Sequence, residues 1–200
     1  MERGHLETAA AKYSGLRGLL ALPGGALCIL AALGNWQVGP FRHAWAFLAG
    51  VALLALVWLA LARHYTDNYG RVSPSATQQV RLGVALAVAI VVMTAGSLLL
   101  RSRADWSLDL PVNAVAISFA LVMLVTYAVG VGLRAYHVVI WGTVLVAGAL
   151  PVWDGPDPSN VGLVLAGVAL MLTGLFDHRA FVRTFGAPGA LRLEEGDVGG

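Results

Sequence analysis

Long apolar runs alternate with short polar segments along the whole chain. The runs are continuous, unlike the ten-residue alternating pattern of membrane barrel strands, so they predict helices. A helix needs about 20 mostly apolar residues to cross a bilayer, and six runs approach that length. They cover residues 16–34, 44–62, 82–100, 111–133, 137–152 and 161–176.

We therefore expect an all-α polytopic membrane protein, built as a six-transmembrane-helix bundle. Residues 1–15 would form a cytoplasmic N-terminal segment and residues 16–177 the transmembrane domain. Residues 178–200 would form a cytoplasmic tail with a disordered end, because the last stretch is polar and rich in glycine.

The composition supports a membrane protein. Hydrophobic residues make up 58% of the chain and charged residues 12%, where a soluble domain has about 25% charged residues. Twelve of the 13 basic residues are arginine, a bias typical of a GC-rich genome, which favours a bacterial plasma membrane. The net charge of +2 gives no sign of nucleic-acid binding, and a lone Cys28 excludes an internal disulfide. No cofactor is indicated.

The basic residues predict the orientation of the bundle. With the N-terminus inside, ten basic residues fall on the cytoplasmic side and three, Arg42, Arg101 and Arg103, on the outer side. Cytoplasmic loops carry the excess of lysine and arginine, so both termini are predicted to be cytoplasmic. Small residues spaced by four, such as Gly24, Cys28 and Ala32, indicate close helix packing.

The predicted spans hold no Asp, Glu, Lys or Arg near their middle. Ionisable groups inside a membrane usually mark ion and proton paths, so this pattern disfavours a proton-coupled transporter. Milder polar groups remain. Asn113, Thr126 and Tyr127 are candidates for an intramembrane polar cavity. The alternative is that such groups bond within the bundle, as Ser and Thr do with a carbonyl one turn back.

Three histidines fall at similar depth on the predicted cytoplasmic side. His64, His137 and His178, together with Asp177, are candidate metal ligands, because imidazole with carboxylate suits Zn²⁺ or Fe²⁺. The alternative is interface anchoring, since His and Arg are favoured at a cytoplasmic helix end. Asp177 and His178 are neighbours in sequence and would point in different directions from one helix.

The loop after the second run contains Tyr65, Tyr69 and Arg71, candidates for contact with lipid headgroups or a cytoplasmic protein partner. Tyr69 begins the segment Tyr-Gly-Arg-Val-Ser-Pro-Ser, and the last run closes with Asp-His-Arg-Ala-Phe-Val-Arg over residues 177–183. Both segments resemble those of small, uncharacterised multi-pass membrane proteins of actinobacteria. The resemblance implies a shared helix layout and brings no activity or site with it.

Three functions remain open from the sequence. The first is a non-enzymatic accessory or partner subunit of a membrane complex, because the chain lacks the Gly-x-Ser-x-Gly and HExxH patterns. The second is a small-solute binding or transport protein, since six helices in 200 residues are similar in outline to the substrate-binding subunits of energy-coupling-factor vitamin transporters. The third is a membrane enzyme with a histidine-based metal site.

Overall fold

The computed structural model describes residues 17–69, 112–153 and 157–185, together with single positions between 80 and 91. In these parts of the chain all regular structure is helical. Three helices are long and apolar enough to cross a membrane: Gly18–Asn35, Ala44–Tyr69 and Pro158–Thr184. Two shorter apolar helices, Ala114–Gly130 and Ala135–Ala149, accompany them.

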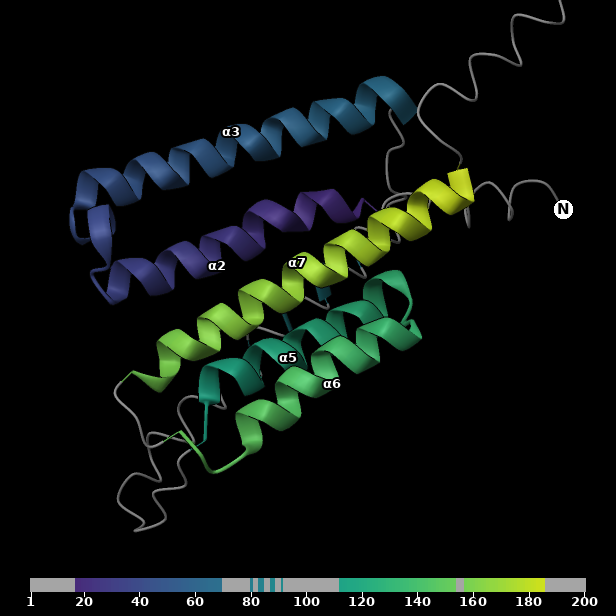
Figure 1. Ribbon diagram of the computed structural model, residues 1–200. Coiled ribbons are helices and arrows are strands. Elements are labelled where there is room, and N and C mark those ends of the chain that lie inside the picture. The colour runs from purple at the N-terminus through teal and green to yellow at the C-terminus, as the bar shows by residue number, and fades with distance from the viewer. Residues whose placement is uncertain are drawn as a thin grey trace, which may run out of the picture.

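Two helical hairpins lie on either side of a central helix (Figure 1). A short 3-10 turn, η1 (Gly18–Leu20), leads into α2 (Ala21–Asn35). A second 3-10 turn, η2 (Gly39–Arg42), connects α2 to α3 (Ala44–Tyr69). The second hairpin consists of α5 (Ala114–Thr126) and α6 (Ala135–Ala149), and α7 (Pro158–Phe185) runs between the two hairpins.

Glycines set the close approach of α2 to α7. A Cβ atom on Gly25 would lie 2.5 Å from the carbonyl oxygen of Gly167, and one on Gly18 would lie 2.0 Å from that of Gly174. The two contacts are seven residues apart along each of the two antiparallel helical segments, which corresponds to about two helical turns. Backbones therefore meet here without side chains between them, as in other small-residue contacts between apolar helices.

Five of the six predicted runs overlap these helices in sequence, but the ends of the runs and of the helices differ. The expected stripe of Gly24, Cys28 and Ala32 is only partly the one used, because the backbone contacts are made by Gly18 and Gly25. The predicted span at 161–176 is too short, since α7 continues to Phe185. Most of the predicted third span, 82–100, lies outside the described residues.

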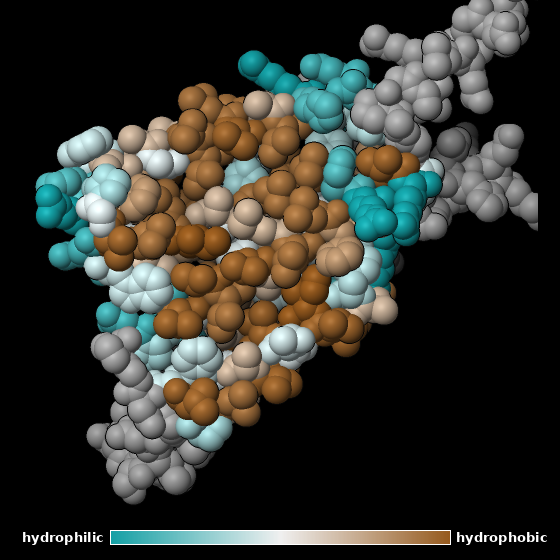
Figure 2. Space-filling view, viewed as in Figure 1, coloured by the Kyte–Doolittle hydropathy of each residue, from teal (hydrophilic) through white to brown (hydrophobic). Residues whose placement is uncertain are grey.

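The surface is divided into apolar and polar zones. Figure 2 shows a broad hydrophobic belt with hydrophilic residues at its two ends. This distribution, together with the three long apolar helices, is compatible with a membrane protein.

Candidate functional site

A buried carboxylate lies at the centre of a polar cluster between α7 and the second hairpin. Asp177 of α7 is 2% exposed. Its Oδ1 accepts hydrogen bonds from the hydroxyl of Tyr136 (2.5 Å) and from Nε2 of His137 (3.0 Å). Its Oδ2 accepts one from the hydroxyl of Tyr127 (3.3 Å). Three side chains from two other segments thus converge on the oxygens of one carboxyl group.

The protonation state of His137 follows from its two neighbours. The backbone N–H of Arg134 donates to Nδ1 at 3.2 Å, so Nδ1 carries no proton. The proton of the neutral ring is therefore on Nε2, which donates it to Asp177. Both ring nitrogens are occupied, and the ring is fully buried and stacked on Tyr127 with 3.8 Å between centroids. His137 consequently has no nitrogen left to act as a general base.

A local change of helix type positions the hydroxyl of Tyr127. The chain passes from α5 into a π-helix, η3 (Tyr127–Val131), which closes with a bond from the Gly132 amide to the Tyr127 carbonyl at 2.8 Å. Gly132 has φ +98°, a conformation that favours glycine. Arg134 then starts α6 and donates from Nη1 to the hydroxyl of Tyr136 at 3.3 Å. The hydroxyl of Tyr136 thus links the guanidinium of Arg134 to the carboxyl group of Asp177.

A second cluster lies beside the first along α7 and includes His178 and Phe181. The hydroxyl of Tyr65 is 2.9 Å from Nδ1 of His178 and accepts from the backbone N–H of Leu19 at 3.3 Å. Phe181 meets the rings of Tyr65 and Tyr69 edge-on, at centroid distances of 5.4 and 4.7 Å. This cluster fastens the end of α3 to α7 and η1, whereas the Asp177 cluster fastens α5 and α6 to α7.

Asparagines join the helices at the other end of the bundle. Asn113 caps α5 by accepting from the Ala116 amide at 3.0 Å and donates to the Pro158 carbonyl at 2.6 Å. Asn35 donates to the side chain of Asn160 at 2.8 Å, which links α2 to α7. Asn113 and Asn160 are both buried. These bonds use the asparagines as structural connections.

The structure separates the three candidates for a polar cavity. Asn113 and Tyr127 lie at opposite ends of α5 and belong to different hydrogen-bond networks. Thr126 donates to the carbonyl of Val122 in its own helix. Asn113 thus lies more than three helical turns from Thr126 and Tyr127, and within the described ranges no hydrogen bond joins it to either.

The four candidate metal ligands are also divided among separate contacts. His137 pairs with Asp177, His178 with Tyr65, and the exposed His64 with Asn68 of its own helix. Within the described ranges, no three His, Cys, Asp or Glu side chains are grouped so that they could hold a metal ion.

The three residues expected to contact headgroups or a partner, Tyr65, Tyr69 and Arg71, differ in their exposure and in whether the structure describes them. Tyr65 is fully buried, so it contacts Phe181 and His178 of the same chain and offers nothing to a headgroup or partner. Tyr69 is half-buried against Phe181, and Arg71 lies outside the described residues. This corrects the surface role predicted for Tyr65, because α3 continues to Tyr69 and the Tyr65 side chain packs against α7.

Sequence reasoning missed the role of Asp177 itself as a buried hydrogen-bond acceptor. The available signal was the amphipathic continuation of α7, since Asp177 and Phe181 are one turn apart and both buried. Comparison of the chain with protein families, with curated proteins and with solved structures found no match.

Proposed function

We propose that this protein is a non-enzymatic partner subunit of a larger complex in a bacterial plasma membrane. It would span the membrane six times, with both termini in the cytoplasm. The grouping of basic residues supports this orientation. Arg17 precedes η1, Arg63 is near the end of α3, Arg134 precedes α6 and Arg179 is near the end of α7. Hydrogen bonds of Tyr65 and Tyr136 bring these segments together at one end of the bundle. A cytoplasmic face carries such an excess of arginine.

The observation that carries the proposal is the unburied face of α3. Only 6% of its apolar window is buried, compared with 28% for the first long helix and 39% for α7. In Figure 1, α3 lies at the edge of the bundle and beside α2. The other described helices therefore leave most of the apolar surface of α3 uncovered.

This face has the spacing of a helix-packing seam. Residues at alternating intervals of three and four lie on one side of a helix and pack against a parallel or antiparallel partner. All five residues of this outer stripe are exposed, and alanines at its centre permit close approach. The outer stripe consists of Trp45, Leu48, Ala52, Ala55 and Leu59.

The internal polar groups support the non-enzymatic part of the proposal. Both nitrogens of His137 are hydrogen-bonded, and the carboxylate of Asp177 accepts from three side chains. These contacts join separate helices, so the groups are used to hold the bundle together. A general base or nucleophile needs a free atom directed at substrate.

Two matched variants test the partner surface. Leu48→Trp places a large ring on the outer stripe, and Val139→Trp places the same ring on α6 at a similarly exposed position (64% and 66% exposed). In membranes of the source bacterium, we expect Leu48→Trp to abolish co-purification of a second protein and Val139→Trp to leave it unchanged. Equal co-purification with both variants would overturn the proposal that α3 contacts the partner.

One observation favours a second candidate, a small-solute binding protein. Asp177 lies within a helix long enough to cross the membrane, and buried ionisable groups in such helices often mark solute or ion sites. A solute with a cationic group would bind this carboxylate by displacing one of its three partners, Tyr127, Tyr136 or His137. A cationic vitamin or metabolite at 100 times its Kd should stabilise the protein by about 2.7 kcal/mol. Asp177→Asn should remove that effect, while exposed Asp157→Asn should retain it; absence of any stabilising solute would eliminate this candidate.

A further inference from the structure

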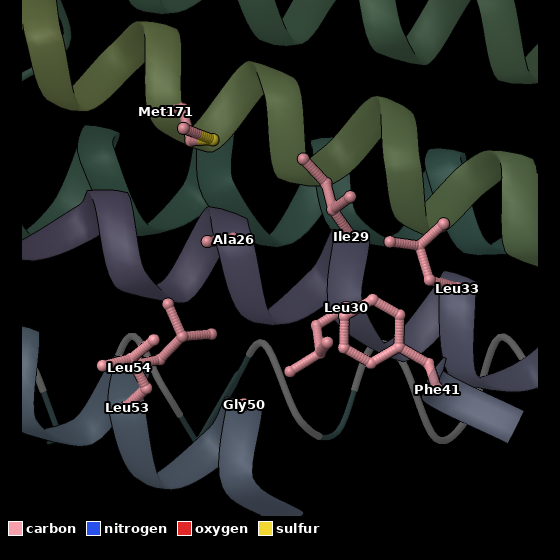
Figure 3. Close-up of a pocket in the computed structure, with 9 residues that line it drawn as sticks. All are labelled: Ala26, Ile29, Leu30, Leu33, Phe41, Gly50, Leu53, Leu54 and Met171. Atoms are coloured by element: carbon pink, nitrogen blue, oxygen red, sulfur yellow. The ribbon is translucent and has the colours of Figure 1, made fainter. Parts of the chain in front are cut away.

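An apolar groove runs between α2 and α3 at the end of the bundle where η2 joins them. Figure 3 shows side chains from both helices around it, together with Met171 on the neighbouring α7. All nine lining residues are apolar, and the volume is about 330 Å³. The groove is lined by Ala26, Ile29, Leu30, Leu33, Phe41, Gly50, Leu53, Leu54 and Met171.

The length and lining of the groove favour a hydrocarbon occupant. Ala26 and Leu33 mark its extent along α2, and seven residues of helix correspond to about 10 Å. Over this length the groove is open on one side and is lined by apolar side chains. An acyl chain of a lipid matches this lining in polarity and can enter from the open side.

Charged and aromatic residues lie beside one end of the groove. Phe41 of η2 lines the groove, and the next residue, Arg42, is exposed. Arg42 donates from Nε to His43 at 3.1 Å, and the ring of His43 stacks with that of Trp45. Trp36 and Trp45 are both exposed at this end. Tryptophan and arginine are the residues that meet lipid headgroups, and arginine attracts their phosphates.

We propose that this groove binds an anionic phospholipid, with one acyl chain between α2 and α3 and the phosphate at Arg42. The hydrocarbon chain and the groove are both apolar, and the negative charge of the headgroup is opposite to that of the Arg42 guanidinium. Gly50 lets the Leu30 side chain lie directly against α3, because a Cβ atom at this position would come within 2.9 Å of it. The groove residues of α3, Gly50, Leu53 and Leu54, are separate from the outer stripe, which shares only Trp45 with the headgroup end.

The test is native mass spectrometry of the full-length protein in detergent. The purified protein is titrated with palmitoyl-oleoyl-phosphatidylglycerol and, separately, with phosphatidylcholine carrying the same chains. One headgroup charge at one arginine is worth about 1 kcal/mol, so the first phosphatidylglycerol should bind roughly fivefold more tightly. Arg42→Gln should abolish this preference, whereas Arg179→Gln, which removes an exposed charge at the opposite end, should retain it.

A second pair of variants tests the groove itself. Ala26→Leu fills the groove and should weaken the first binding event for both lipids by about tenfold. Ala49→Leu adds the same atoms to an exposed position of α3 outside the groove and should bind as the wild type does. Unchanged binding by Ala26→Leu, or equal binding of both lipids by the wild type, would overturn the proposal. Because Arg42 is exposed, its variant decides the question even if Ala26→Leu does not fold.

Discussion

Replacement of Asp177 should show how strongly the buried cluster holds the second hairpin to α7. Asp177→Ala removes the acceptor for Tyr127, Tyr136 and His137 at once. Interhelical hydrogen bonds in membrane proteins average about 0.6 kcal/mol each and reach about 1.7. Three of them correspond to a loss of about 2–5 kcal/mol. His137 and Tyr127 carry most of this loss because they are buried, whereas half-buried Tyr136 retains the guanidinium of Arg134 as a donor.

Asp177→Asn is the matched control. The amide keeps one carbonyl oxygen, which can accept from Tyr136 and His137 as Oδ1 does. Its NH₂ group faces the hydroxyl of Tyr127, which can rotate to accept. The variant therefore loses the negative charge but keeps the hydrogen-bond connections. We expect it to be destabilised by about 1 kcal/mol, well below the alanine variant.

Thermal unfolding in detergent micelles, followed by circular dichroism, measures the difference. For a chain of this size, 1 kcal/mol corresponds to roughly 2–4 °C, so Asp177→Ala should melt about 4–20 °C below the wild type. Unfolding of such a protein is often irreversible, and all variants need the same heating rate. A wild-type melting temperature for Asp177→Ala would refute the reasoning. Equal losses in both variants would assign the effect to charge instead of hydrogen bonding.

Three further substitutions test other contacts with the same assay. Gly18→Ala places a methyl carbon 2.0 Å from a carbonyl oxygen of α7 and should cost about 1–3 kcal/mol, whereas Gly142→Ala enters open space and should stabilise α6 by up to about 1 kcal/mol. Asn113→Ala removes the cap of α5 and should cost about 1–2 kcal/mol. Tyr65→Phe leaves a buried amide without its acceptor and should cost about 1–2 kcal/mol. Wild-type stability in any of the three destabilising variants would contradict the corresponding contact.

Hydropathy predicts the positions of the helices because each apolar run is long and continuous. It predicts their ends less well. α3 extends to Tyr69 and α7 to Phe185 through polar residues that lower the local mean. Those residues remain helical because their partners come from distant segments: Tyr127 and His137 meet Asp177 across 50 and 40 positions. No local average contains that information.

The candidate site was predictable in composition but not in arrangement. The sequence places His137, Asp177 and His178 at one end of the bundle, and all three do participate in buried or half-buried contacts there. The rotation of about 100° between neighbours on a helix sends Asp177 toward α6 and His178 toward α3. A histidine-rich metal site and two separate tyrosine contacts are equally consistent with the same residues until the helices are placed.

The sequence alone also could not identify which small residues form the contact between α2 and α7. Gly24 and Gly25 are adjacent, and either could lie in a helix contact by spacing alone. Only Gly25 meets backbone across the interface, whereas Gly24 meets the end of the Leu170 side chain. In a chain with 24 glycines, many stripes have suitable spacing. The backbone path of α7 decides which one is used.

The most direct test of the proposed function is a native mass spectrum of the protein released gently from membranes of its own host. The account predicts the mass of this 20.9 kDa chain together with that of a different protein, and loss of that protein in the Leu48→Trp variant. A spectrum containing only the bare chain, or only copies of it, would contradict the assignment as a partner subunit.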